Sequence, residues 1–135
     1  MKRTGLLYDE RFLLHRTDSG HPECSDRLAT AYRALEEAGL LAYLTMVQAT
    51  PARLKWIERV HSPRHIFRFE EACMLELGEL DHADNQICKD SYDTALLAVG
   101  GILKTIDLLM EGNLDNIIDA LTAQDRVEHL EEQPA

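Results

Sequence analysis

The sequence predicts a mostly helical domain that contains two short strands. Two brief apolar runs, at residues 4–8 and 44–49, have the length of buried strands. Elsewhere, apolar residues recur at intervals of three and four, which is the period of an amphipathic helix. The chain has 135 residues, which suits a single domain, and chains of this size bury roughly two-thirds of their unfolded surface.

The first part of the chain alternates strand and helix. After the strand at residues 4–8 we expect an irregular loop over residues 10–24. Ser25 can cap the next helix, because its hydroxyl can accept a free backbone N–H. Gly39 is a natural end for that helix, because glycine accepts the left-handed conformation. The second strand is expected at residues 44–49.

Two hydroxyl–proline pairs predict the starts of the next two helices. Thr50-Pro51 and Ser62-Pro63 each place a capping hydroxyl before a proline. The proline suits the first helical position, where its missing N–H costs nothing. Residues 78–90 contain one glycine and four acids, and we expect them to form a polar loop.

The longest predicted helix spans residues 91–111 and contains Gly100-Gly101 in its middle. Two interior glycines cost roughly 1 kcal/mol each relative to alanine, so we expect another backbone to pack closely there. Residues 114–135 fit a further, fifth helix that carries six acids and one arginine. We therefore divide the chain into residues 1–113 and an acidic tail. The apolar stripe of the long helix consists of Tyr92, Ala95, Leu96, Val99, Leu103, Ile106, Leu109 and Met110.

The composition argues against several classes of protein. The formal net charge is −10, whereas non-specific nucleic-acid binding needs a basic face. Cys24, Cys73 and Cys88 lack Cys-x-x-Cys spacing, which argues against a disulfide framework and favours reduced thiols. The N-terminal apolar run is too short for a signal peptide or a membrane span. We therefore expect a cytoplasmic protein whose partners are neither nucleic acid nor membrane.

No group of residues assembles a catalytic or metal site from spacing alone. His61 and His65 are four residues apart, but the proline between them begins a helix and leaves the first outside. His82 and Asp84 lack a third ligand. Residues 21–24 crowd a histidine, a glutamate and a cysteine more closely than zinc sites usually do. We favour structural roles for all three groups and predict neither catalytic nor metal-ligating residues.

Several short motifs nevertheless follow one another in a specific order along residues 4–116. In kind and spacing they resemble the N-terminal motifs of the zinc-dependent deacetylases, which include histone deacetylases, acetoin-utilisation proteins and acetylpolyamine amidohydrolases. Each motif is modest alone, but their shared order makes the match specific. The motifs are Gly5-Leu6-Leu7-Tyr8-Asp9-Glu10-Arg11-Phe12-Leu13-Leu14-His15, Gly20-His21-Pro22-Glu23 with Arg27-Leu28, Val60-His61-Ser62-Pro63 with Ile66, Leu80-Asp81 through Asp84, Ser91-Tyr92-Asp93-Thr94-Ala95, and Gly100-Gly101.

The resemblance implies a fold that is α/β by ancestry. It would be the N-terminal part of the arginase/deacetylase fold, with two short parallel strands at one edge and about five helices. It also implies two substrate-binding residues. Arg27 would lie in the internal channel through which acetate is thought to leave, where a guanidinium suits a carboxylate, although bracing the loop against its helix explains Arg27 equally well. Asp84 would match the rim aspartate that grips the substrate backbone.

The sequence also departs from the family in ways that bear on catalysis. Cys24-Ser25 stands where the family has Arg-Pro, and Lys89-Asp90 where it has Pro-Gly. After Asn116 the family continues into a strand and an Arg-Pro-Pro-Gly-His-His motif, but this sequence has no His-His pair and no Asp-x-His. In the family those groups hold zinc, which lowers the pKa of water and polarises the amide. We therefore expect a truncated member that binds no cofactor and has no activity alone.

Three hypotheses for function stay open at this point. The first is a silent, deacetylase-derived domain that acts by association, as a homodimer or with another protein. The second is a zinc-dependent amidohydrolase of acyl-lysine or acetyl-amine substrates, completed by another chain. The third is a fragment without a selected function. An uncovered strand edge and apolar stripe favour the first, because such surfaces tend to be covered, either by the tail or by a second copy.

Overall fold

The computed structural model of the chain describes residues 4–112. Contacts divide the chain into two units, residues 1–105 and 106–135. Within the described residues, all strands and all helices but the end of the last one lie in the first unit. In the second unit, residues 106–112 continue that last helix. The predicted acidic tail, residues 114–135, lies outside the described residues.

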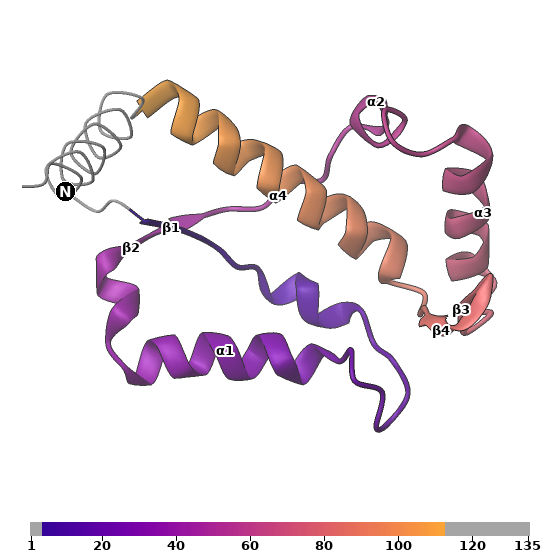
Figure 1. The fold of residues 1–135 in the computed structure, drawn as a ribbon, viewed down its shortest axis with the longest axis horizontal. Coiled ribbons are helices and arrows are strands. Elements are labelled where there is room, and N and C mark those ends of the chain that lie inside the picture. Colours follow the sequence, from indigo (N-terminus) through magenta and orange to yellow (C-terminus); the bar gives the residue numbers. More distant parts are fainter. Residues whose placement is uncertain (1–3, 113–135) are drawn as a thin grey trace, which may run out of the picture. The chain divides into compact units, whose positions relative to one another are not determined.

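The two short strands pair in parallel, as the resemblance implied. β1 (Thr4–Leu7) and β2 (Leu44–Val47) form a two-stranded sheet in which Thr4 faces Leu44 and Leu7 faces Val47. α1 (Ser25–Glu37) lies between them in sequence and provides the long crossover that parallel strands require (Figure 1). Two short 3₁₀ helices flank α1: η1 (Glu10–Leu14) within the expected loop, and η2 (Leu40–Tyr43) before β2.

The ends of α1 test the capping predictions. Gly39 adopts the left-handed conformation, with φ of 68°, directly after the helix, so its predicted role is confirmed. The Ser25 prediction is wrong by one position: Cys24 is the N-cap residue and makes no side-chain capping bond. The reason is local, because the Cys24 carbonyl already accepts the Arg27 N–H at 3.2 Å and starts the helix there. The rings of Tyr8 and Tyr32 stack at 3.9 Å and join the helix to the end of β1.

The two hydroxyl–proline predictions have opposite outcomes. α3 (Pro63–Met74) begins as predicted, and the Ser62 hydroxyl accepts the His65 N–H. The Thr50-Pro51 prediction is wrong, because that segment has no regular secondary structure and the short α2 (Leu54–Ile57) begins after it. A tertiary contact explains this outcome. The Ala52 N–H donates to the Leu96 carbonyl of α4 at 2.9 Å, and this contact holds the segment against α4 in place of a first helical turn.

A small hairpin replaces the predicted polar loop at residues 78–90. β3 (Glu79–Leu80) and β4 (His82–Gln86) pair antiparallel, and Asp81 turns between them with φ of 64°. Most residues of both strands are exposed. Polar, exposed strands lack the alternating apolar pattern that marks a half-buried strand, so sequence patterns did not predict them.

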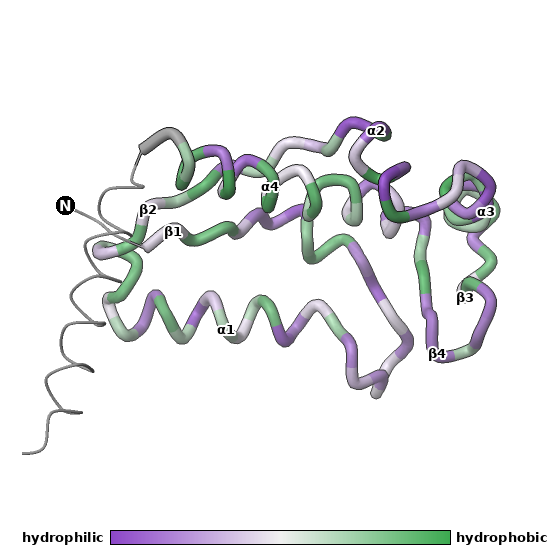
Figure 2. Tube along the Cα trace, turned by 45° about the horizontal axis from the view of Figure 1, so that its top comes forward, coloured by the Kyte–Doolittle hydropathy of each residue, from purple (hydrophilic) through white to green (hydrophobic). Residues whose placement is uncertain are grey.

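The long helix α4 (Ser91–Gly112) packs closely against the segment that follows β2. A Cβ added to Gly100 would overlap the Thr50 carbonyl oxygen and lie 2.5 Å from the Ala52 nitrogen. This confirms that a second backbone packs against the glycine pair. Leu97 of α4 and Ala49 are almost fully buried nearby. Figure 2 shows the apolar residues that recur along α1 and α4.

A second buried cluster joins α3 to the hairpin and to the start of α4. Ala72, Cys73 and Ile87 form its centre, with Phe69, Leu80 and Tyr92 packed against it.

Within the described residues, no helix combines the length and apolar character needed to cross a bilayer.

Candidate functional site

The loop at residues 15–24 lies directly against β4. The Asp18 N–H donates to Gln86 Oε1 at 2.7 Å, and Gln86 Nε2 donates to Asp18 Oδ2 at 3.3 Å. Next to them, the Arg16 N–H donates to Cys88 Sγ at 3.3 Å. These bonds join segments about 70 residues apart in sequence and bring two of the recognised motifs together.

The loop keeps its bent shape through its own hydrogen bonds. Gly20 has φ of 90°, a conformation that favours glycine. The His21 N–H donates to the Asp18 carbonyl at 3.1 Å and closes a turn. The Thr17 hydroxyl donates to the Glu23 carbonyl, and the Glu23 N–H donates to His21 Nδ1 at 3.2 Å. The loop therefore presents His21 in a defined position.

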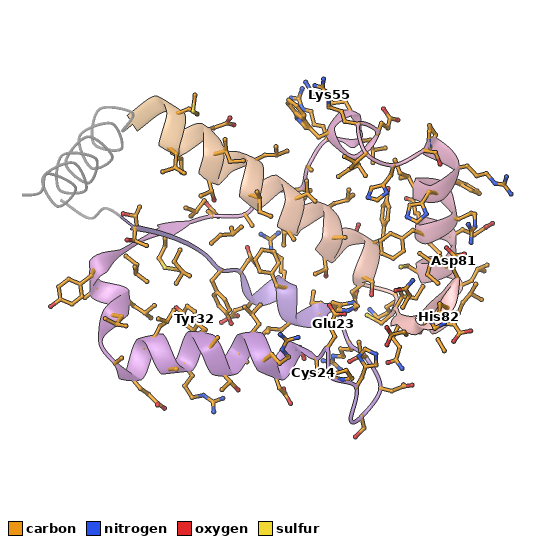
Figure 3. All side chains as sticks on the ribbon, in the orientation of Figure 1. Glu23, Cys24, Tyr32, Lys55, Asp81 and His82 are labelled. Atoms are coloured by element: carbon orange, nitrogen blue, oxygen red, sulfur yellow. The ribbon has the colours of Figure 1, made fainter. Side chains whose placement is uncertain are left out.

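The structure brings His21 and Asp84 to the same edge of the molecule. His21 Nε2 lies 3.7 Å from Asp84 Oδ1. The ring nitrogen is buried and has no hydrogen-bond partner among the described residues, whereas the Asp84 side chain is 83% exposed. Asp84 therefore offers an accessible carboxylate beside the loop. Figure 3 labels Glu23 and Cys24, which precede α1, and His82 on β4.

Arg27 lies in a different hollow from Asp84. Its side chain is exposed on the first turn of α1 and lines an open hollow of about 400 Å³. Phe12, His15 and Glu23 are among the other residues around this hollow, and Asp84 is not. The two predicted substrate-binding residues thus do not share this hollow.

A polar cluster that sequence reasoning missed lies beneath the loop. His15 Nδ1 is 2.7 Å from Ser91 Oγ, and Ser91 is 4% exposed. The Cys88 N–H donates to the same hydroxyl oxygen at 2.8 Å, and the hydroxyl reaches Cys88 Sγ at 3.4 Å. His15 and Ser91 are 76 positions apart, so no local pattern connects them. Both stand in recognised motifs, which was the available signal.

The thiols of Cys88 and Cys73 differ in acidity. Burial alone would raise the pKa of the Cys88 thiol, but hydrogen bonds from the Ser91 hydroxyl and from the N–H groups of Arg16 and Asp90 outweigh it, so the pKa is lowered. Cys73 is 1% exposed, and burial raises the pKa of its thiol. Of these two thiols, Cys88 is therefore the more acidic.

Comparison with known proteins decides the family. The sequence profile of the histone deacetylase domain matches residues 21–123. The chain belongs to the histone deacetylase family. It is 28% identical over 125 residues to "Histone deacetylase 5" of Arabidopsis thaliana, a match that covers 84% of this chain and 18% of that protein. It is 30% identical over 115 residues to "Probable deacetylase" of Archaeoglobus fulgidus, covering 84% of this chain and 32% of that protein.

A solved structure of the family agrees with the fold. The crystal structure of the HDA15 HD domain matches with a TM-score of 0.67 and 26% sequence identity, and the match covers 73% of this chain and 29% of that chain. The chain thus spans about a third or less of the length of these relatives. The family resemblance and the partial arginase/deacetylase fold are confirmed.

Histone deacetylases are zinc-dependent, so the described residues can be tested as zinc ligands. Among residues 4–112, no group of three or more His, Cys, Asp and Glu side chains could hold a metal ion. His82 and Asp84 lie together, but His82 Nδ1 accepts the Asp84 backbone N–H at 3.2 Å. The rings of His61 and His65 stack with centroids 5.0 Å apart. The described residues do not fit a zinc site, which needs three or four converging ligands.

Proposed function

We propose that this chain is a histone-deacetylase-like domain that is catalytically silent by itself and acts by association, first of all with a second copy. The observation that carries the association is the two-stranded parallel sheet. Parallel strands normally lie inside larger sheets with both faces covered, and two strands alone are marginal in water. In the described part of the chain, no third strand pairs with either β1 or β2.

The side chains near the sheet add to the argument for association. Met46 of β2 is 48% exposed, and Tyr43, just before that strand, is 72% exposed. Exposed apolar side chains beside unpaired strand edges favour pairing with another surface. A two-fold symmetric dimer is the commonest closed solution, because one patch then serves both copies.

Catalytic silence is supported by the sequence. Six histidines are present, none of them adjacent to another, and none stands in an Asp-x-His motif. Three free cysteines are found at Cys24, Cys73 and Cys88, which suits the reducing cytoplasm that we propose as the location. Without a metal to polarise the amide and to activate water, the largest source of transition-state stabilisation for this chemistry is missing.

Light scattering on the purified chain tests the association. We expect a dimer that dissociates on dilution. Met46→Lys should shift the protein toward monomer, because it places a charge in the apolar patch beside the sheet. Met74→Lys is the matched control, since Met74 is 78% exposed on α3 and should leave the dimer unchanged. A chain that is monomeric at all concentrations would contradict the proposal, as would zinc-dependent hydrolysis of acetyl-lysine by the chain alone.

One observation favours a second candidate function, completion of an amidohydrolase by another chain. The loop at residues 15–24 and β4 keep an ordered edge with Asp84 exposed beside His21, where the family resemblance implies the substrate rim. Mixing with a polypeptide that carries the His-His and Asp-x-His motifs should then produce activity. Asp84→Asn should reduce that activity and Asp26→Asn, an exposed position on α1, should not. Absence of activity on mixing would count against this candidate.

A further inference from the structure

A separate cavity lies among α2, α3 and α4. Its volume is about 200 Å³, which is small for a drug-sized ligand but sufficient for a short chain or one ring. None of the residues that line it belongs to the loop at residues 15–24 or to the hairpin. The lining residues are Trp56, Ile57, Val60, His61, His65, Ile66, Phe69, Tyr92, Ala95, Leu96 and Val99.

The walls of this cavity favour an apolar guest. Aliphatic and aromatic side chains from three helices make up most of the lining, and Phe69 packs edge-on against Tyr92 with centroids 5.7 Å apart. The stacked imidazoles of His61 and His65 add a flat surface. Apolar lining with a few polar groups is the usual character of small-molecule sites.

Two cationic side chains lie close to one lining residue of this cavity, Trp56. Trp56 forms part of the wall, and its ring lies 5.1 Å from Lys55 Nζ and 5.8 Å from Arg59 Cζ. Lys55 is exposed on α2, where Figure 3 labels it. Residues 53–68 hold five of the chain's 14 Lys and Arg residues and one acid, whereas the whole chain has a net charge of −10. This local excess of positive charge favours an anionic group near Trp56.

Tyr92, another lining residue, has acidic rather than basic neighbours. Burial and then the nearby carboxylates of Glu70 and Asp93 raise the pKa of Tyr92. An anionic group is therefore disfavoured beside Tyr92 and favoured beside Trp56. This polarity gives a bound ligand one orientation.

We propose that this cavity binds a small amphipathic carboxylate. The apolar tail lies between Phe69, Tyr92 and Val99, and the carboxylate lies at the Trp56 end within reach of Lys55 and Arg59. This site is distinct from the substrate rim and does not depend on the proposed association or on catalysis.

Trp56 is the only tryptophan in the chain, so its fluorescence reports directly on this cavity. We propose to titrate the full chain with octanoate and, as matched ligands, with octanol and octylamine. Octanoate should change the Trp56 emission saturably and bind about tenfold more tightly than octylamine, because two cations attract one head group and repel the other. Octanol should be intermediate, and added salt should reduce the preference.

Variants then separate the charge from the cavity. Arg59→Glu should weaken octanoate binding about fivefold, and Arg33→Glu, the same change on the exposed face of α1, should not. Val99→Leu should reduce the affinity for octanoate and octanol alike by filling the cavity, with circular dichroism to verify that the variant is folded. An unchanged emission, or equal affinities for octanoate and octylamine, would overturn the proposal.

Discussion

Two junctions hold distant parts of this chain together by different means. Where α4 crosses the segment after β2, backbone meets backbone, and a methyl group on Gly100 would overlap the Thr50 carbonyl oxygen. Where the loop at residues 15–24 meets β4, contact is made through hydrogen bonds of exposed groups, such as those between Asp18 and Gln86. The first junction depends on shape and the second on polar pairing.

The difference indicates which parts of the chain can change at low cost. A close-packed contact has no room for added atoms, so even a small residue forces the backbone to move. Exposed hydrogen bonds exchange readily with water and contribute little net free energy. We therefore expect the first junction to determine the fold, and the second to tolerate substitutions that alter the candidate rim.

The largest expected effect comes from Gly100→Ala. We expect the free energy of unfolding to fall by about 2–4 kcal/mol, because backbone overlap outweighs the better helix propensity of alanine. Urea unfolding followed by circular dichroism measures this change. Gly101→Ala is the control: its Cβ would lie 2.6 Å from the tip of the Leu7 side chain, which can rotate, so the loss should be smaller. Equal stability of Gly100→Ala and the parent chain would refute the steric account.

An intermediate effect is expected for Ser91→Ala, in the buried cluster of His15, Cys88 and Ser91 next to the second junction. The change leaves the Cys88 N–H and His15 Nδ1 without their partner, and a buried group that loses its bond costs about 1–3 kcal/mol. The same unfolding measurement applies. Ser19→Ala, in the exposed loop, should be nearly neutral, and a similar loss in both variants would argue against a special role for Ser91.

Gln86→Ala should have a small effect, less than about 1 kcal/mol, although it removes two hydrogen bonds to Asp18. Asn85→Ala on the same exposed strand is the matched control. Hydrogen exchange should nevertheless show faster exchange of the Asp18 N–H in Gln86→Ala alone. A loss of several kcal/mol would mean that this junction is as important to the fold as the glycine contact.

The smallest expected effect concerns Asp9 and its dependence on pH. The Arg11 side chain donates to both carboxylate oxygens of Asp9, at 2.8 and 2.7 Å, and lowers the pKa of that carboxyl. A folded-state pKa below the unfolded value, about 3.9, means that the stabilisation is complete above that pH and is lost as pH falls through the lowered value. Thermal unfolding of the parent chain should thus approach that of Asp9→Asn only below about pH 4. A difference that persists unchanged at low pH would contradict this assignment.

Sequence patterns predicted the fold well where the determinants are local. Gly39 and Ser62-Pro63 act through their own backbone conformation and hydrogen bonds, and both predictions are confirmed. Thr50-Pro51 failed because a contact with α4 supplied a competing partner for the Ala52 N–H. The hairpin at β3 and β4 was missed because its strands are polar and exposed.

The candidate site, too, was predicted only in part from the sequence. Motif order identified both the loop that carries His21 and Asp84, but only the structure shows that their side chains lie 3.7 Å apart. The functions of Arg27 and Asp84 stay predictions. The cluster of His15, Cys88 and Ser91 escaped detection, because only folding brings residues so far apart in sequence into contact.

The bond between His15 and Ser91 has a consequence for the order in which the chain folds. It closes a segment of 76 residues, whereas helices such as α3 need only neighbouring residues. Closing a long segment costs more chain entropy and slows the contacts that depend on it. Helices should therefore form first, and the loop at residues 15–24 should acquire its shape last, once α4 is in place to receive it.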